Sequence, residues 1–466
     1  MRRHHLHVYL FLLMAAPAWC GSCAPAGGEA GWQPPRVVRI AGVKEAYSLS
    51  PMYGVVFAGD VRAKDQPGEG PTWLLVRDGE AIAAEGIGPI IYRAADGNAL
   101  TVTRAEGAML LAGKVVALDL SADAGWQWLE TAAPEGMAHL RFVLVKGSVT
   151  PERLALLEKL AAANPSVGLM CADEELAKVL PLLRPAWFSG NLAAVAAGGE
   201  ALLARLDQVE TLMVEAGKCE DLAPLAKLPA LRRLVLTDWK EAEKRPLPDN
   251  LPALQALVVF GGDMGDLAPL GRQPGLEELS LVLTQELSDL GRLAEWPHLK
   301  TLSLQACGDV TDLAPLAHLK ELRWLALPPK TTQEQLAQVA ADHPGLIVLQ
   351  AVGCEAITDL APVKTLRNLE VLVLVVKAPL EPCPELKSLR LLAVHKPDEK
   401  ATEQEVKEVG AAVAAFMEIH PDTAVVWVKP VCLGSGWILA LGPAGALAWW
   451  VARRRRPGAQ PDVRHA

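Results

Sequence analysis

Cysteine and histidine are the residue types in this chain best suited to metal, redox or nucleophilic chemistry. The 466 residues include eight cysteines and ten histidines. Cys20 and Cys23 stand near the start of the chain and Cys432 near its end. The body between them has no Cys-x-x-Cys or His-x-x-x-His spacing that would indicate a metal site. We therefore expect no metal, and we interpret the cysteines of the body as buried free thiols rather than disulfides or metal ligands.

A catalytic site is also hard to assemble from these residues. No histidine occurs between His7 and His139, so that stretch lacks the commonest general base. The chain has no Gly-x-Ser-x-Gly elbow, phosphate loop or Gly-rich dinucleotide turn. We expect a protein that is not an enzyme and holds no cofactor. The alternative is an envelope enzyme whose activity lies in residues 33–114, with the rest as a targeting module. Its pocket would be lined by Asp60, Asp65, Arg93 or Asp96.

The charge distribution argues against nucleic acid as a partner. The net charge of -9 combines 45 basic with 54 acidic residues. Seven arginines and one aspartate lie in the two tails, which leaves 38 basic and 53 acidic residues, or -15, for the middle. A surface of that sign repels phosphate backbones, and no basic stripe offsets it.

The first residues have the composition of a secretory signal peptide. Arg2 and Arg3 precede an apolar run over residues 8–19, and small residues follow over 20–26. Twelve apolar residues are too few to span a bilayer, so residues 1–26 are predicted to be a signal peptide. Cys20 or Cys23 is a candidate for lipidation, since the segment before Cys23 ends like a bacterial lipoprotein signal.

The last residues predict a membrane anchor. Residues 431–452 carry no charge, and as a helix they would reach about 33 Å, enough for the hydrocarbon core. Arginines fill positions 453–456 at the start of the basic tail 453–466, and they favour the cytoplasmic side. The segment resembles the tripartite sorting signals of bacterial surface proteins such as the GlyGly-CTERM class. The candidate sorting or processing residues are Cys432, Gly434 and Gly436.

A repeating block organises the middle of the chain. Leu-x-x-Leu-x-Leu occurs at residues 231–236, 276–281, 299–304, 322–327 and 369–374, with weaker copies at 209–214, 254–259, 346–351 and 386–391. Its middle leucine recurs every 22 to 24 residues, at Leu212, Leu234, Leu257, Leu279, Leu302, Leu325, Leu349 and Leu372. Alternate leucines of such a strand point to one side, and one unit cannot bury that row alone. The pattern therefore predicts stacked units that share a leucine core and a parallel sheet.

A second block keeps step with the first. Asp-Leu-Ala-Pro begins at Asp221, Asp266, Asp312 and Asp359, and its aspartate is placed to cap a short helical turn. Together the two blocks resemble the leucine-rich-repeat family, and the Thr-Asp-Leu-Ala-Pro-Leu segment resembles its bacterial internalin-like subclass. Cys307 and Cys354 stand where that family places Asn or Cys.

These patterns predict an α/β chain: a leucine-rich-repeat solenoid with a parallel sheet, preceded by a small β-rich domain and followed by one transmembrane helix. Residues 33–114 form the β-rich domain, because strand-like runs alternate with Asp-Gly turn pairs. The remaining expected parts are degenerate repeats at 115–205, leucine-rich repeats at 206–394, a capping unit at 395–430, the span at 431–452 and the tail.

The family resemblance implies that a protein partner docks on the x positions of Leu-x-x-Leu-x-Leu. One row of these positions is Arg233, Glu278, Thr301, Trp324, Val348 and Val371, and the adjacent row is Ser280, Ser303, Ala326, Gln350 and Val373. An exposed Trp324 beside the valines would make a protein-binding patch. The alternative is that a flanking loop or the β-rich domain covers it. We expect an exported, membrane-anchored binding scaffold whose repeats face the periplasm or cell exterior.

Overall fold

The structure is a computed structural model that describes most of the repeats and several strands before them. The described residues are the strands β1 (Arg36–Ile40), β2 (Ser48–Ser50), β3 (Gly54–Phe57), β4 (Thr72–Val76), β5 (Ile90–Arg93) and β6 (Ala99–Ala105), and residues 107–111, 114–140, 142–375, 380, 383–395 and 402–428. Within these ranges no helix combines the length and apolar character needed to span a bilayer.

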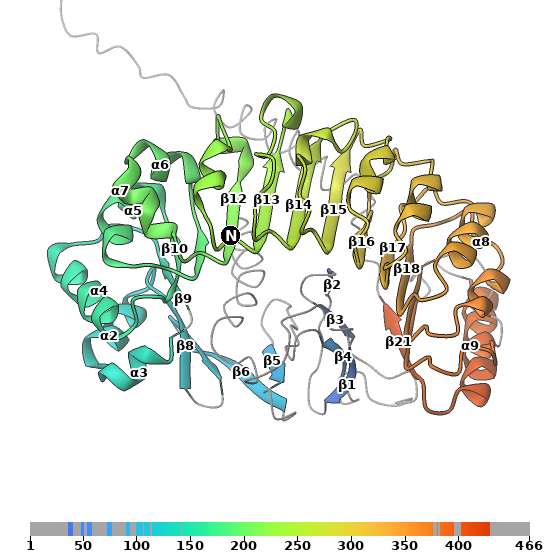
Figure 1. Ribbon diagram of the computed structural model, residues 1–466. Helices are drawn as coiled ribbons and strands as arrows, with labels where there is room; N and C mark the ends of the chain where they lie inside the picture. The colour runs from blue at the N-terminus through green and yellow to red at the C-terminus, as the bar shows by residue number, and fades with distance from the viewer. Residues whose placement is uncertain are drawn as a thin grey trace, which may run out of the picture. The chain divides into compact units, whose positions relative to one another are not determined.

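Fourteen of the described strands form one parallel ladder. They are β8 (Lys114–Asp119), β9 (Phe142–Val145), β10 (Gly168–Cys171), β11 (Trp187–Ser189), β12 (Thr211–Glu215), β13 (Arg233–Trp239), β14 (Ala256–Asp263), β15 (Glu278–Gln285), β16 (Thr301–Ser303), β17 (Trp324–Ala326), β18 (Val348–Val352), β19 (Val371–Val375), β20 (Leu391–His395) and β21 (Ala424–Val428). Each pairs in parallel with the next along the chain, through thirteen successive pairings. Strands β12 to β18 follow one another side by side in Figure 1.

The predicted leucine register is confirmed residue by residue. Leu279 lies opposite Leu302, which lies opposite Leu325, and the same line joins the other middle leucines of the repeats. All of them are at most 2% exposed. Since a one-residue slip would turn a whole row to the other face, this register fixes which face of the sheet holds the leucine core.

Helical turns connect the strands. The α-helices are α2 (Asp123–Thr131), α3 (Pro134–Ala138), α4 (Pro151–Ala163), α5 (Asp173–Val179), α6 (Leu192–Ala197), α7 (Glu200–Leu203), α8 (Gln333–Asp342) and α9 (Glu403–Ile419). The repeats between α7 and α9 mostly use 3-10 turns, including η5 (Ala223–Lys227), η7 (Ala268–Leu270), η8 (Gly291–Glu295), η9 (Ala314–His318) and η10 (Ala361–Thr365).

The aspartates of the second block cap these turns, as predicted. The carboxylate of each accepts a hydrogen bond of 2.7–2.9 Å from the backbone N–H two residues on, and Asp289 does the same. The two longest helices of the C-terminal repeats have reciprocal capping boxes, Thr332 with Gln335 in α8 and Thr402 with Glu405 in α9. Local capping therefore sets where each connection starts.

In five of the described repeats a residue just after the strand core adopts a left-handed backbone conformation. These residues are Asp238, Gly261, Leu283, Ala306 and Gly353, with φ between 51° and 75°. The pairing of β13, β14 and β15 skips the first three of them together and resumes beyond. These five units thus share a left-handed turn at the same place, whether or not glycine is present.

The strands before the ladder are antiparallel. β1 to β4 form a separate sheet in the order β1-β4-β3-β2. β5, β6 and β7 (Ala108–Leu111) pair successively, and β7 pairs with β8. The sheet therefore continues across the boundary that we expected at residue 114. Its strand order also returns from β21 to β5.

Several of the sequence predictions concern residues outside those that the structure describes. They are the signal peptide at 1–26, the span at 431–452, the tail at 453–466, and Cys20, Cys23, Cys432, Gly434 and Gly436. Asp60, Asp65 and Asp96 are outside the description as well, and Arg93 is described only as a position in β5.

Candidate interaction face

The x positions form two rows on the face of the sheet that is turned away from the leucine core, here named the second face. In the first row Glu278, Thr301, Trp324, Val348 and Val371 lie opposite one another on successive strands. In the second row the same pairings align Ser280, Ser303, Ala326, Gln350 and Val373. The structure therefore brings the candidate residues together as the sequence predicted, and Arg233 continues the first row on β13.

Our expectation that Trp324 is exposed is wrong. Its exposed fraction is 0%, and Val348, Val371, Val373 and Thr301 are buried with it. Glu278 is buried too, while Arg233 is half-buried. The periodicity of a strand separates two faces but does not say what covers each one. At these positions both faces of the sheet are covered, as in α/β proteins whose parallel sheets are buried on both sides, whereas Phe260 on the same face of β14 is 42% exposed.

The second face also holds polar atoms that are buried without a hydrogen-bond partner. They include the hydroxyls of Ser280 and Ser303, the indole Nε1 of Trp324 and both amide atoms of Gln350. Folded proteins pair the large majority of such groups, because each one left unpaired costs about 1–3 kcal/mol. Their concentration on adjacent strands β15 to β18 marks this face as one that the fold alone does not explain.

Gln273, in the same solenoid, differs from Gln350 in the hydrogen bonding of its side chain. It is as buried as Gln350, at 1% exposed. Its side-chain oxygen accepts from the backbone N–H of Leu251 at 3.1 Å, and its amide nitrogen donates to the carbonyls of Pro248 and Leu270 at 2.9 and 3.0 Å. A buried glutamine that serves the fold is thus fully bonded here, and Gln350 is not.

The second face combines polar and apolar groups. Hydroxyl, indole and amide groups stand among valine and alanine side chains, an arrangement that orients a polar chain against an apolar surface. Over the described residues no group of three or more His, Cys, Asp or Glu side chains is placed to hold a metal ion.

The described cysteines are free thiols, and all five are buried. The Cys307 thiol donates to the carbonyl of Leu281 at 3.3 Å, and the Cys354 thiol donates to that of Pro328 at 3.4 Å. Each thiol thus bonds the preceding repeat. Burial raises the pKa of Cys171, Cys307 and Cys354 to about 12, so they stay protonated and unreactive at neutral pH.

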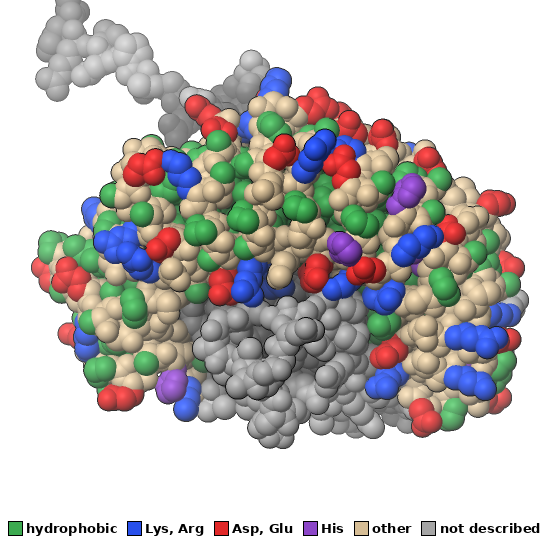
Figure 2. All heavy atoms as spheres, viewed as in Figure 1, with side chains coloured by type: hydrophobic (Ala, Val, Ile, Leu, Met, Phe, Trp, Pro, Cys, Tyr) green, Lys and Arg blue, Asp and Glu red, His purple; other side chains and the backbone are tan. Residues whose placement is uncertain are grey.

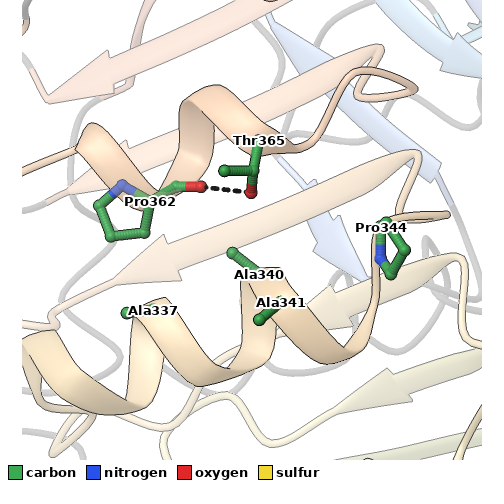
Figure 3. Close-up of a pocket in the computed structure, with 6 residues that line it drawn as sticks. All are labelled: Ala337, Ala340, Ala341, Pro344, Pro362 and Thr365. Carbon is green, nitrogen blue, oxygen red and sulfur yellow. Dashed lines mark hydrogen bonds between the residues drawn. The ribbon is translucent and has the colours of Figure 1, made fainter.

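On the helical side of the sheet, α8 and η10 enclose a small apolar notch. Ala337, Ala340 and Ala341 of α8 face Pro362 and Thr365 of η10, with Pro344 at one end (Figure 3). The Thr365 hydroxyl donates its hydrogen to the carbonyl of Pro362 at 2.8 Å, so that hydrogen is not available to a ligand. With no polar group left to orient a ligand among these residues, the notch is explained as small residues packed between neighbouring repeats.

The described part of the surface carries charges of both signs. Figure 2 shows acidic and basic side chains interspersed with apolar ones over the visible repeats, with no continuous basic field on that side. Most of the ion pairs are exposed, such as Arg184 with Asp207 and Lys330 with Asp309, and exposed pairs contribute little to stability.

One parallel strand per 22 to 24 residues, a continuous leucine core and capped turns together define the class: the chain is a leucine-rich-repeat protein. No protein-family model matches it, and no curated protein does.

Solved structures of similar chains are leucine-rich-repeat proteins as well. An internalin F from Listeria monocytogenes has 20% identity and a TM-score of 0.38, covering 62% of this chain and 81% of that one. A leucine-rich-repeat protein of Leptospira interrogans has 15% identity and a TM-score of 0.37, covering 66% and 89%. An internalin C2 from Listeria monocytogenes has 19% identity and a TM-score of 0.30, covering 50% and 89%. Since these TM-scores are below 0.5, the fold assignment rests on the chain's own repeats and strand register.

Proposed function

We propose that this protein is a non-enzymatic, surface-tethered scaffold that binds another polypeptide through the second face of its repeats. The carrying observation is the set of buried, unpartnered polar atoms on that face, at Ser280, Ser303, Trp324 and Gln350. Side chains that weaken the fold are retained where they serve function. Here they are placed to meet the backbone groups of a bound chain.

The apolar members of the rows favour a polypeptide over a small polar ligand. Trp324 offers a large flat side chain, and Val348, Val371 and Val373 extend the same surface over two further strands. Aromatic anchors surrounded by smaller apolar contacts are typical of protein-binding hot spots. The apolar residues would supply contact area and the polar atoms would fix the direction of the bound chain.

Tethering at the surface is proposed from the sequence. The apolar start at 8–19, the uncharged stretch at 431–452 and the arginines at 453–456 are arranged as in a protein that is exported and then held in the membrane. An acidic repeat domain outside the cell would meet other proteins of the envelope or its surroundings.

The test is a comparison of matched variants of the full chain. A partner is first captured by cross-linking in intact cells and purified. Its affinity is then measured for wild type, Ser303→Ala, Gln350→Met and, as a control on the helical side, Thr365→Val. For each second-face variant we expect the affinity to be roughly 5-fold to 10-fold weaker, which corresponds to the loss of about one hydrogen bond. The control variant should bind with the affinity of wild type. Equal affinities for all four proteins would move the binding surface elsewhere.

A further inference from the structure

Phe260 stands on the second face of β14 and is open to solvent. Its exposed fraction is 42%, and it is the only aromatic residue among the exposed large hydrophobic side chains of the described chain. It lies opposite Thr237 on β13 and Val282 on β15, neither of which is aromatic or charged. A large part of its ring is therefore available to a ligand at this edge of the second face.

The backbone after Phe260 brings Asp263 to the same side of the sheet. Gly261 has a φ of 73°, and the strand pairing passes over it. A Cβ atom at Gly262 would meet side chains of the leucine core, so that position faces the core and Asp263, the next one, faces away from it. Phe260 and Asp263 are thus successive side chains on one face, about 7 Å apart along the strand.

The carboxylate of Asp263 is half-buried and has no counterion. No hydrogen bond or ion pair joins it to another residue of the described chain. The acidic residues at the ends of the two preceding strands differ in this respect: Asp238 pairs with Lys240 at 3.1 Å, and Glu215 pairs with Lys218 at 2.8 Å. A partner that brought a positive charge with N–H donors would complete the pairing of Asp263.

The loops that follow β12 to β16 form an acidic edge around these two residues. They hold twelve acidic and four basic side chains, a net charge of -8, over residues 215–222, 237–245, 260–267, 283–290 and 305–313. The segments that return to the next strands hold five acidic and eight basic side chains, a net charge of +3, over residues 223–233, 246–256, 268–278, 291–301 and 314–324. The charge of the repeats is therefore unevenly divided, and the edge that carries Phe260 and Asp263 attracts cations.

We propose that Phe260 and Asp263 bind an arginine side chain of the polypeptide partner. A guanidinium group is planar, so it can stack on the exposed ring while its N–H groups donate to the carboxylate beside it. A lysine ammonium supplies the charge but has no planar surface for stacking. That the partner is a polypeptide rests on the proposed function, whereas the guanidinium site does not.

A dye-labelled peptide of four arginines tests the site on the full chain, and a peptide of four lysines is its comparison. Phe260→Leu keeps an apolar side chain but removes the ring, and Asp263→Asn removes the charge with little change in shape. Glu220→Gln is the matched control, because it removes one negative charge from the same acidic edge, after β12. The native thiols of Cys307 and Cys354 are buried, so their resistance to labelling shows that each variant is folded.

Fluorescence anisotropy in about 0.15 M salt measures the affinities. Asp263→Asn should bind the arginine peptide about 10-fold more weakly than wild type, and Phe260→Leu about 3-fold more weakly. Glu220→Gln should differ from wild type by less than about 2-fold, and wild type should bind the lysine peptide more weakly than the arginine peptide.

Two results of this titration would overturn the proposal. Equal losses for Asp263→Asn and Glu220→Gln would show that the edge attracts cations through its net charge alone. Full affinity of Phe260→Leu for the arginine peptide would show that the ring takes no part.

The partner captured in cells separates this site from the proposed function. Weaker binding of that partner by both Phe260→Leu and Asp263→Asn would support the site. A partner that responds to Ser303→Ala and Gln350→Met but to neither of these would refute the arginine site and leave the proposed function standing. Binding of the arginine peptide as expected, together with a partner that ignores Ser303→Ala and Gln350→Met, would support the site and refute the proposed function.

Discussion

The carboxylate of Asp312 accepts a hydrogen bond from the backbone N–H of Ala314 at 2.9 Å, at the start of the turn η9. The same contact starts the corresponding turns in the neighbouring repeats. This hydrogen bond pairs a backbone N–H that the turn itself leaves unpaired. It therefore helps to fix where the turn begins after each of these strands.

Asp312→Ala should therefore lower the free energy of unfolding by about 1 kcal/mol. Asp312→Asn keeps an acceptor oxygen in the same place and should lose much less. Urea unfolding of the two variants and wild type measures both values. An equal loss in both variants would mean that the carboxylate acts through its charge and not through this hydrogen bond.

At a left-handed position we predict a substitution that raises the free energy of unfolding instead of lowering it. Ala306 has a φ of 60°, a conformation that costs an ordinary residue about 1 kcal/mol and glycine almost nothing. Ala306→Gly should raise the free energy of unfolding by about 0.5 kcal/mol after the entropy of the unfolded chain is counted.

The matched control for that change is Ala337, an exposed residue inside the regular helix α8. Ala337→Gly should lower the free energy of unfolding by about 1 kcal/mol, since glycine is a poor helix former. If both glycine variants are destabilised to the same degree, the turn at Ala306 is not strained.

The leucine register and the capped turns could be predicted because each follows from a short sequence block that repeats along the chain. A period of 22 to 24 residues places Leu302 between Leu279 and Leu325 without any knowledge of distant contacts. The left-handed turn after the strand was harder to predict from the sequence. Gly261 and Gly353 signal it, but Leu283 and Ala306 adopt the same conformation with no signal in their residue type.

The burial of Trp324 could not be predicted, because the pattern of a strand separates its two faces and says nothing of what lies over either one. Alternation along β17 shows that Trp324 and Leu325 point to opposite sides, but it does not show what lies beyond Trp324. The pairing of β7 with β8, and the contact of β3 with β21, join parts of the chain that share no repeat, so these contacts could not be predicted from the repeats either.

The anchoring hypothesis predicts a change of compartment. A chain ending at Val428 should be released into the periplasm or medium, provided that Cys20 and Cys23 are not lipidated. Replacing the arginines at 453–456 by glutamines should weaken retention or scramble orientation, because the orienting charge is gone. Cell fractionation and the intact mass of the mature protein measure this. Full-length protein that stays in the aqueous fraction with residues 431–452 attached would defeat the hypothesis.

The central claim is that the polar groups of the second face are kept for binding and not for folding. The stability of two matched variants tests it most directly. Gln273 and Gln350 are equally buried, but Gln273 makes three hydrogen bonds and Gln350 has no partner for either amide atom. Methionine has nearly the same shape and no polar group to satisfy.

In urea unfolding, Gln273→Met should lower the free energy of unfolding by about 1–3 kcal/mol, because it leaves the N–H of Leu251 and the carbonyl of Pro248 unpaired. Gln350→Met should leave it unchanged or raise it, because only unpaired atoms are removed. A loss for Gln350→Met as large as that for Gln273→Met would show that Gln350 serves the fold, and would contradict the account.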